Sequence, residues 1–249
     1  VLCERYRLGI AVYGLEARGF RDGQACFGSL DEMVTEYVRQ IREVQPAGPY
    51  LLGGWSFGVS VAFAVAQQLI RDGEVVETFI SIDAEAPRVP RDFEDFIRTR
   101  QIGRLDDLYE DAALGELLQR FGQRFGFAAN DTEPVREQFH RFLGYSLGDA
   151  QAQRERYGKV AIANLYNARG IQPERIGPRH TVLVRASLSA FENYMGDWSD
   201  LLSGKVLSSI TLNGDHWSIM QDPELAQYLA RSLASAAHAG SPVVLAAAA

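Results

Sequence analysis

The chain has 249 residues and a formal net charge of −7 at pH 7, with 47% hydrophobic and 23% charged residues. This length can bury a substantial core, as one large domain or two small ones. The acidic balance argues against binding to a nucleic-acid backbone as the main function, because that needs clustered Lys and Arg residues.

The cysteine content and the hydropathy indicate the compartment. Cys3 and Cys26 are the two cysteines, too few for a disulfide scaffold and without the spacing of zinc ligands. The sequence shows no apolar run of about 18 residues or more and no leader-like start. We therefore expect a cytoplasmic protein with no structural metal, neither exported nor inserted in a membrane.

Short apolar runs alternate with amphipathic stretches at both ends of the chain. Strands are predicted at 10–15, 50–55 and 76–82, with helices at 29–43 and 59–70. The alternation resumes with strands at 180–186 and 206–212 and helices at 189–202 and 222–236. A β–α alternation of this kind implies a mostly parallel sheet flanked by helices.

The middle third carries no strand pattern. Helical patterns occupy 91–100, 105–125, 134–147 and 151–166. We interpret residues 88–178 as a helical insertion within one domain, whose core comprises 1–87 and 179–240. Residues 241–249 are expected to be a tail or a cloning remnant.

The stretch YLLGGWSFG at 50–58 places Ser56 between Gly54 and Gly58, where the strand gives way to a helix. A nucleophile on such a turn needs neighbours without side chains, because the backbone there is strained and closely packed. The turn lifts the hydroxyl clear of the sheet. It also leaves the Phe57 N–H at the N-terminus of the helix, where it can stabilise an oxyanion.

A serine nucleophile requires a base, and the chain has four histidines. His140 falls in the helical insertion, His180 starts a strand, and His238 lies at the C-terminal end. His216 instead follows the last predicted strand of the alternation, in the loop LNGDHWSIMQDP. In a parallel sheet that loop opens at the same edge as Ser56, so we select His216 as the base.

The base needs a carboxylate to orient it. Asp83 directly follows the strand at 76–82 and should emerge at the same edge. Asp215 is adjacent to the histidine but is better explained as a hydrogen-bond acceptor that shapes the loop, while Asp197 and Asp200 remain alternatives. The order Ser, Asp, His agrees with an α/β-hydrolase fold, here with a helical lid insertion.

Five stretches carry a family resemblance: VYGLEARG, VQPAGPY, GPYLLGGWSFG, FISIDAEAP and LNGDHWSIMQDPELAQYLA. They resemble the type I thioesterase domains that terminate nonribosomal peptide synthetases and related polyketide assembly lines, over residues 10–87 and 180–235. The resemblance implies that Ser56 is acylated by a chain delivered on the phosphopantetheine of a carrier domain, expected in the same polypeptide. It also implies Asp83 and His216 as partners of the serine, the insertion as a lid, and no bound cofactor.

The sequence departs from that family at two places. Val59 follows the motif where the family usually has glycine. The family's first core strand and oxyanion loop, which normally precede the strand at 10–15 and would lie in the middle of the sheet, are not found in residues 1–9. We therefore expect either a sequence that is truncated at its start or a disabled protein, and we favour truncation, with the second oxyanion donor in the missing loop.

The expected chemistry is acyl transfer to Ser56, followed by hydrolysis or macrocyclisation. Residues 88–104 carry five arginines and form either a docking face for an acidic carrier domain or a solvated helix. Trp55 and Trp217 are weaker candidates for contact with substrate. Aromatic residues of the insertion line an acyl pocket or simply fill its core: Phe121, Phe125, Phe127, Phe139, Phe142 and Tyr145.

Three other functions stay open at this point. A stand-alone editing thioesterase would use the same three residues on short acyl groups. A lipase or esterase would accept oxygen esters without a carrier. A hydrolase-fold binding module would not react with a fluorophosphonate at Ser56.

Overall fold

The computed structural model describes residues 11–19, 21, 23–87, 91–113, 151–189, 194–203, 205–216, 218–236 and 243–246. The chain divides into two compact units. The first, the sheet unit, comprises Val1–Glu16, Asp31–Pro87 and Gln172–Ala248. The second, the helical unit, comprises Ala17–Leu30, Arg88–Ile171 and Ala249.

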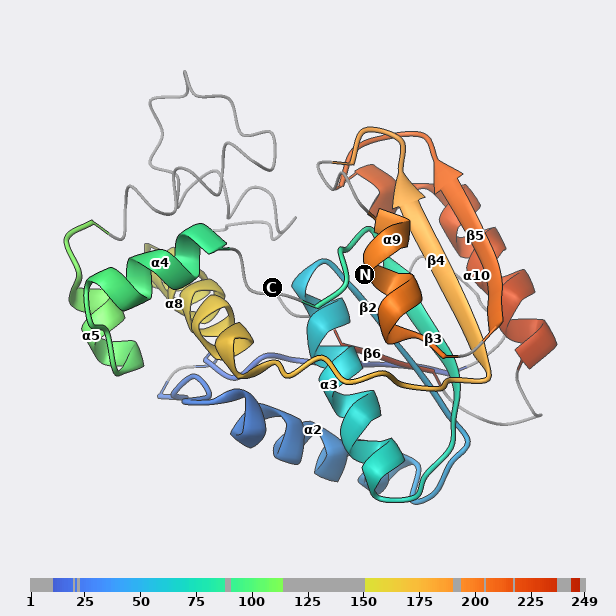
Figure 1. Cartoon of the computed structure of the whole chain (residues 1–249), viewed down its shortest axis with the longest axis horizontal. Helices are drawn as coiled ribbons and strands as arrows, with labels where there is room; N and C mark the ends of the chain where they lie inside the picture. The colour runs from blue at the N-terminus through green and yellow to red at the C-terminus, as the bar shows by residue number, and fades with distance from the viewer. Residues whose placement is uncertain are drawn as a thin grey trace. The chain divides into compact units, whose positions relative to one another are not determined.

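The sheet unit is built on one parallel sheet (Figure 1). Its strands are β1 (Val12–Leu15), β2 (Tyr50–Trp55), β3 (Val76–Ile82), β4 (His180–Ala186), β5 (Lys205–Leu212) and β6 (Val243–Ala246). They lie in the order β1-β6-β2-β3-β4-β5, and each adjacent pair is parallel. The carboxyl ends of β2 to β5 therefore meet at one edge of the sheet, which we call the carboxyl edge.

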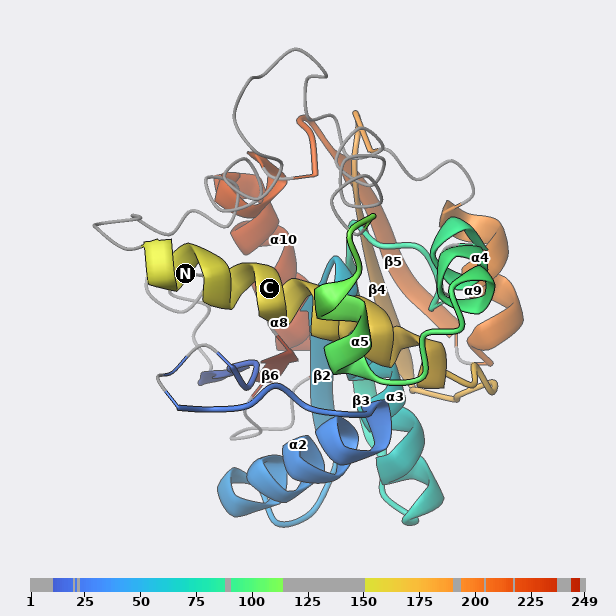
Figure 2. The same cartoon turned by 90° about the vertical axis from the view of Figure 1, so that its left-hand side faces the viewer.

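Helices cover both faces of this sheet. They are α2 (Leu30–Val44), α3 (Phe57–Arg71), α9 (Tyr194–Leu201) and α10 (Pro223–Ala236), with the short 3-10 helix η2 (Ser218–Gln221) before the last. Figure 2 shows α3 and α9 on one side of the sheet and α10 on the other. The parallel α/β architecture predicted from the sequence is confirmed.

Alternation along β3 explains why both faces can be covered. Phe79 points to one face, where its ring lies 6.0 Å from that of Phe63 in α3 and 5.7 Å from that of Trp198 in α9. Its neighbour Ile80 joins the apolar cluster on the opposite face, together with Leu229 of α10. Successive strand residues point to opposite faces, so a strand buried on both sides needs apolar residues without a break.

The strands at 50–55, 76–82 and 180–186 have the bounds that the sequence predicts. β1 begins two residues later than predicted, and β5 begins one residue earlier. The helix predicted over 189–202 corresponds to α9, which spans Tyr194–Leu201.

The C-terminal segment was expected to be a tail, and the structure corrects this. Val243–Ala246 forms β6, which pairs with β1 on one side and β2 on the other. Leu52 and Gly54 of β2 are in register with Val244 and Ala246. The segment lacks a polar face because a strand inside the sheet needs none.

The helical unit has its own small core. It contains α4 (Arg91–Thr99), α5 (Leu105–Glu110), α8 (Gln151–Asn167) and the 3-10 helix η1 (Ala168–Gly170). Buried apolar side chains hold these helices together: Phe93, Ile97, Ile102, Leu108 and Ile162. The helix predicted over 105–125 ends at Glu110, and the one predicted over 134–147 lies outside the described residues.

Residues 17–30 also belong to the helical unit, although the sequence pattern placed them in the core. The buried Asn167 side chain donates to the Phe27 carbonyl at 3.0 Å and so fixes this segment to the end of α8. The unit overlaps the predicted insertion at 88–178. A lid role for it stays a prediction.

Within the described parts of the chain, each helix is too short or too polar to cross a bilayer.

Candidate active site

Ser56 occupies a strained turn between β2 and α3. Its backbone has φ 54° and ψ −131°, and the helix begins at the next residue, Phe57. Positive φ is uncommon for a residue other than glycine and is found where the surrounding structure enforces it. Here the Ser56 N–H donates to the Ile82 carbonyl at 3.2 Å, and the Val59 N–H donates to the Ser56 carbonyl at 3.0 Å.

Gly54 makes this turn possible. A Cβ at this position would lie 2.3 Å from the carbonyl carbon and oxygen of Gly58 and 2.5 Å from the Val59 nitrogen. These atoms belong to the first turn of α3, so the glycine lets the helix fold back tightly against β2. Val59, where the related family usually has glycine, is fully buried in this packing.

Phe57 is the first residue of α3. The first N–H groups of a helix have no partner within the helix, and the positive end of its dipole lies there. The predicted role of the Phe57 N–H as an oxyanion donor remains a proposal.

Asp83 directly follows β3 and is fully buried. Its Oδ2 lies 2.7 Å from His216 Nδ1, and its Oδ1 accepts the Ala186 N–H at 2.9 Å. Its own N–H donates to the Val184 carbonyl at 2.7 Å, and its φ is 42°. Both carboxylate oxygens are therefore engaged, which a buried charge requires.

His216 lies in the loop after β5 and is 4% exposed. The preceding Gly214 has φ 128°, and a Cβ there would lie 2.5 Å from Ser218 Oγ. The turn that follows is closed by Asp215, whose carboxylate accepts the Ser218 N–H at 2.8 Å. Asp215 therefore has the contacts of a residue that shapes the loop.

The turn after β4 holds the histidine loop in place. The Ser187 N–H donates to the Leu212 carbonyl at 2.8 Å, and the Leu188 N–H donates to the Gly214 carbonyl at 2.9 Å. Ser187 Oγ accepts the Gly214 N–H at 3.1 Å. Since Ala186 donates to Asp83, this one turn is bonded to the acid and to the loop of the base.

Trp55 joins the loop of His216 to the strand that precedes Ser56. Its Nε1 donates to the His216 carbonyl at 3.0 Å. Its ring lies 5.0 Å from the imidazole, centroid to centroid, with 26° between the two planes. The sequence suggested contact with substrate for Trp55, whereas these two contacts are with the candidate base.

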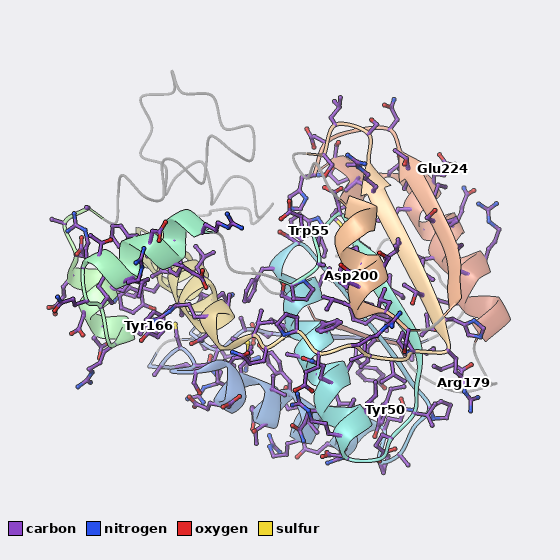
Figure 3. The ribbon with its side chains drawn as sticks, viewed as in Figure 1. Tyr50, Trp55, Tyr166, Arg179, Asp200 and Glu224 are labelled. Atoms are coloured by element: carbon purple, nitrogen blue, oxygen red, sulfur yellow. The ribbon has the colours of Figure 1, made fainter. Side chains whose placement is uncertain are left out.

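Figure 3 shows the two edges of the sheet. Tyr50 and Arg179 lie where β2 and β4 start, and Trp55 lies where β2 ends. His180 belongs to the starting edge, where its Nε2 is 3.4 Å from the buried Glu77. Because the strands are parallel, His180 at the start of β4 and Ser56 after the end of β2 lie at opposite edges of the sheet.

The other acids and histidines raised by the sequence have different surroundings. Asp197 and Asp200 lie in α9, and Asp200 is exposed. His140 and His238 lie outside the described residues, as do Trp217 and the six aromatic residues of the insertion, Phe121, Phe125, Phe127, Phe139, Phe142 and Tyr145.

Sequence reasoning missed Ala186, Ser187 and Trp198. Trp198 Nε1 donates to the Ala84 carbonyl at 3.2 Å, directly after the candidate acid. The contacts at Ala186 use its backbone, which no side-chain pattern reveals. The end of the strand at 186 was the one available signal, because it placed this backbone beside residue 83.

The described residues contain no cluster of three or more His, Cys, Asp or Glu side chains suited to a metal ion.

A serine on a strand-to-helix turn, with an acid and a histidine on later turns of the same parallel sheet, defines an α/β-hydrolase fold. The family profile described as "Thioesterase domain" matches residues 3–235. The chain therefore belongs to the thioesterase domain family.

Curated relatives are large synthases. Orsellinic acid synthase of Emericella nidulans is 29% identical over 248 residues, covering 86% of this chain and 11% of the synthase. The dimodular nonribosomal peptide synthase of Bacillus subtilis is 47% identical over 73 residues, which cover 29% of this chain and 3% of that protein. The chain thus spans only a small part of the relatives that it matches.

Solved structures share the fold. A four-domain nonribosomal peptide synthetase bound to AMP and glycine aligns with a TM-score of 0.62 and 23% identity, over 89% of this chain and 17% of that chain. The Vlm2 thioesterase domain bound with a dodecadepsipeptide aligns with a TM-score of 0.59 and 20% identity, over 92% and 84%.

Proposed function

We propose that this chain is a serine thioesterase that releases an acyl chain from the phosphopantetheine thioester of a carrier domain. Ser56 is the nucleophile, His216 the general base and Asp83 its orienting acid. The observation that carries the proposal is the buried hydrogen bond of 2.7 Å between Asp83 Oδ2 and His216 Nδ1. The imidazole ring of His216 also stacks on Trp55, the residue that precedes Ser56. Membership of the thioesterase domain family supports the substrate class.

In the first step, Ser56 Oγ attacks the thioester carbonyl while His216 Nε2 takes its proton. The carboxylate of Asp83 keeps the remaining proton on Nδ1 and offsets the charge of the imidazolium. The N–H of Phe57, at the start of α3, stabilises the oxyanion. The C–S bond then breaks, and the leaving thiolate takes the proton from the imidazolium, which returns His216 to its neutral form.

In the second step, His216 removes a proton from the nucleophile that attacks the acyl-serine. Water gives a free acid, whereas a hydroxyl or amine of the same chain gives a macrocycle. In both cases the Ser56 oxygen leaves and regains its proton from His216. We propose that the helical unit selects between the two outcomes by how far it excludes water from the bound chain.

We further propose that the carrier belongs to the same polypeptide, because the curated relatives are multidomain synthases of far greater length. For the stretch 88–104 the sequence allowed two interpretations, a docking face for the carrier and a solvated helix. Three arginines of the stretch 88–104 each pair with an acid of the helical unit: Arg98 with Asp95 at 2.6 Å, Arg100 with Asp111 at 3.0 Å and Arg104 with Asp106 at 3.5 Å.

The test uses an acyl thioester of N-acetylcysteamine, a short mimic of the phosphopantetheine arm. The wild-type chain is expected to release thiol, and Ser56→Ala is expected to abolish release while leaving the thermal unfolding midpoint near the wild-type value. The exposed Asp200→Asn serves as a control and should retain full activity. Turnover by Ser56→Ala at the wild-type rate would overturn the proposal.

Two further measurements separate the remaining functions. Faster cleavage of a matched oxygen ester than of the thioester would indicate an esterase. Failure of a fluorophosphonate to label Ser56 in folded protein would indicate a binding module. The mass of the product released from a carrier-bound chain distinguishes hydrolysis from cyclisation, because the cyclic product lacks one water.

A further inference from the structure

We propose that Trp55 is a positioning residue for His216, which ties the strand of the nucleophile to the loop of the base. The inference rests on the proposed function, since it assigns a role to a residue that neither accepts a proton nor forms a bond to the substrate. It also moves Trp55 from substrate contact, the role suggested by the sequence, to alignment of the base.

Two contacts of different kinds join the two residues. The indole N–H donates to the His216 carbonyl at 3.0 Å and thereby fixes the backbone of the loop. The indole ring lies nearly parallel to the imidazole at a centroid distance of 5.0 Å and fixes the plane of the side chain. The partners are 161 residues apart in the chain, so this connection bridges two separate turns.

The bond to Asp83 alone leaves one motion of the imidazole free. With Nδ1 held 2.7 Å from the carboxylate, the ring can still rotate about that hydrogen bond when its side-chain torsions change together with a small shift of the loop. Such rotation takes Nε2 out of the orientation that proton transfer from Ser56 requires, while the bond to the acid survives. The stacked indole opposes this rotation, and the reaction needs that alignment because a displacement of about 1 Å can cost about 100-fold in rate.

Trp55 is adjacent to the proposed nucleophile in the chain, which couples the position of its ring to that of Ser56. Trp55 directly precedes Ser56, whose backbone conformation is set by the turn at Gly54. Any displacement of β2 therefore moves the nucleophile and the stacking ring together. The hydrogen bond and the ring contact of the indole thereby link the position of His216 to that of the nucleophile.

The stack also has an electrostatic consequence. When His216 accepts the serine proton, the imidazole becomes a cation lying over the face of an indole, which is the aromatic ring that attracts cations most strongly. This attraction is absent before proton transfer and develops during it. It therefore accelerates acylation, by about 2-fold to 30-fold for interactions of this class.

The experiment compares two substitutions in the full chain. Trp55→Phe keeps an aromatic face and loses the N–H donor, whereas Trp55→Leu loses both. Phe63→Leu is the matched control, because it removes a fully buried ring that packs edge-on against Phe79 and at a tilt against Trp198. The readouts are kcat and KM on the N-acetylcysteamine thioester, the rate of fluorophosphonate labelling, and the thermal unfolding midpoint.

We expect Trp55→Leu to lower kcat about 100-fold with KM within about 2-fold of the wild-type value. The kcat of Trp55→Phe should be about 10-fold higher than that of Trp55→Leu, because phenylalanine restores an aromatic face beside the imidazole. The labelling rate should fall in parallel, and Phe63→Leu should leave kcat near wild type. In proton NMR spectra, the Nδ1–H resonance of His216 should shift or broaden in Trp55→Leu and stay in place in Phe63→Leu.

Contrary outcomes separate this inference from the proposed function. A rise in KM with unchanged kcat in Trp55→Leu would mean that the indole contacts substrate. An equal loss of kcat in Phe63→Leu would mean that Trp55 acts only by stabilising the fold. If Trp55→Leu fails to fold, equal kcat values for Trp55→Phe and wild type overturn the inference. A wild-type chain that does not turn over the thioester refutes the proposed function itself.

Discussion

Replacing Asp83 by Asn tests the proposed role of the acid with little change in shape. The carboxylate accepts the Ala186 N–H with one oxygen and faces His216 Nδ1 at 2.7 Å with the other. The amide of Asn can keep the first bond through its oxygen. Its NH₂ group then faces Nδ1 and needs an acceptor there, which moves the imidazole proton to Nε2.

An imidazole protonated at Nε2 cannot take the proton of Ser56. The equivalent substitution in a serine protease lowers kcat by about 10⁴-fold, which corresponds to about 5 kcal/mol of transition-state stabilisation. We expect a loss of similar size here in the turnover of the N-acetylcysteamine thioester. Because the bond to Ala186 is kept, the free energy of unfolding should fall by less than about 2 kcal/mol.

Asp83→Ala provides a second comparison, since it leaves the buried Ala186 N–H without its acceptor. This variant should lose about 1–3 kcal/mol of stability, measured by urea unfolding, in addition to its activity. A loss in kcat below about 10-fold in folded Asp83→Asn would refute the assignment of this residue as the acid.

Three further predictions concern the scaffold and the thiol. Gly54→Ala should lower the free energy of unfolding by about 3 kcal/mol or more, since its Cβ would lie 2.3 Å from the Gly58 backbone. Gly14→Ala is the control: a Cβ there has no atom within 4 Å, so the free energy of unfolding should change by no more than about 1 kcal/mol. Val244→Pro should lower the free energy of unfolding in urea by about 1–3 kcal/mol, because proline lacks the N–H that a strand between β1 and β2 uses. An unchanged unfolding midpoint would contradict the place of β6 in the sheet. Burial raises the pKa of the Cys26 thiol, so iodoacetamide should alkylate this thiol more slowly at pH 8 than it alkylates a model thiol. The alkylation rate should increase as the pH rises above 9, and equal rates for the two thiols at pH 8 would contradict the burial.

The sequence predicted most of the sheet unit because its signals are local. An apolar run such as that at 76–82 is buried on both faces of the sheet, so its extent can be read from the residues. The edge at which Ser56, Asp83 and His216 emerge also follows from chain order alone, because every strand of a parallel sheet points the same way.

Long-range contacts could not be predicted in the same way. β6 pairs with strands that precede it by about 200 residues, and four apolar residues near a chain end carry no sign of their partners. The stacking of Trp55 on His216 depends on the loop conformation set by Gly214 and the turn at Ser187. Likewise, residues 17–30 are placed in the helical unit by tertiary contacts such as the bond from Asn167 to Phe27.

The acyl-enzyme itself is the most direct test of the central proposal. The wild-type chain is mixed rapidly with the N-acetylcysteamine thioester, quenched in acid, digested and analysed by mass spectrometry. The account predicts the mass of the acyl group on the peptide that contains Ser56, and no adduct in Ser56→Ala. An adduct on another residue would contradict the account. So would thiol release by the wild-type chain without acyl-serine at the earliest times, if His216→Ala also still turns over the thioester.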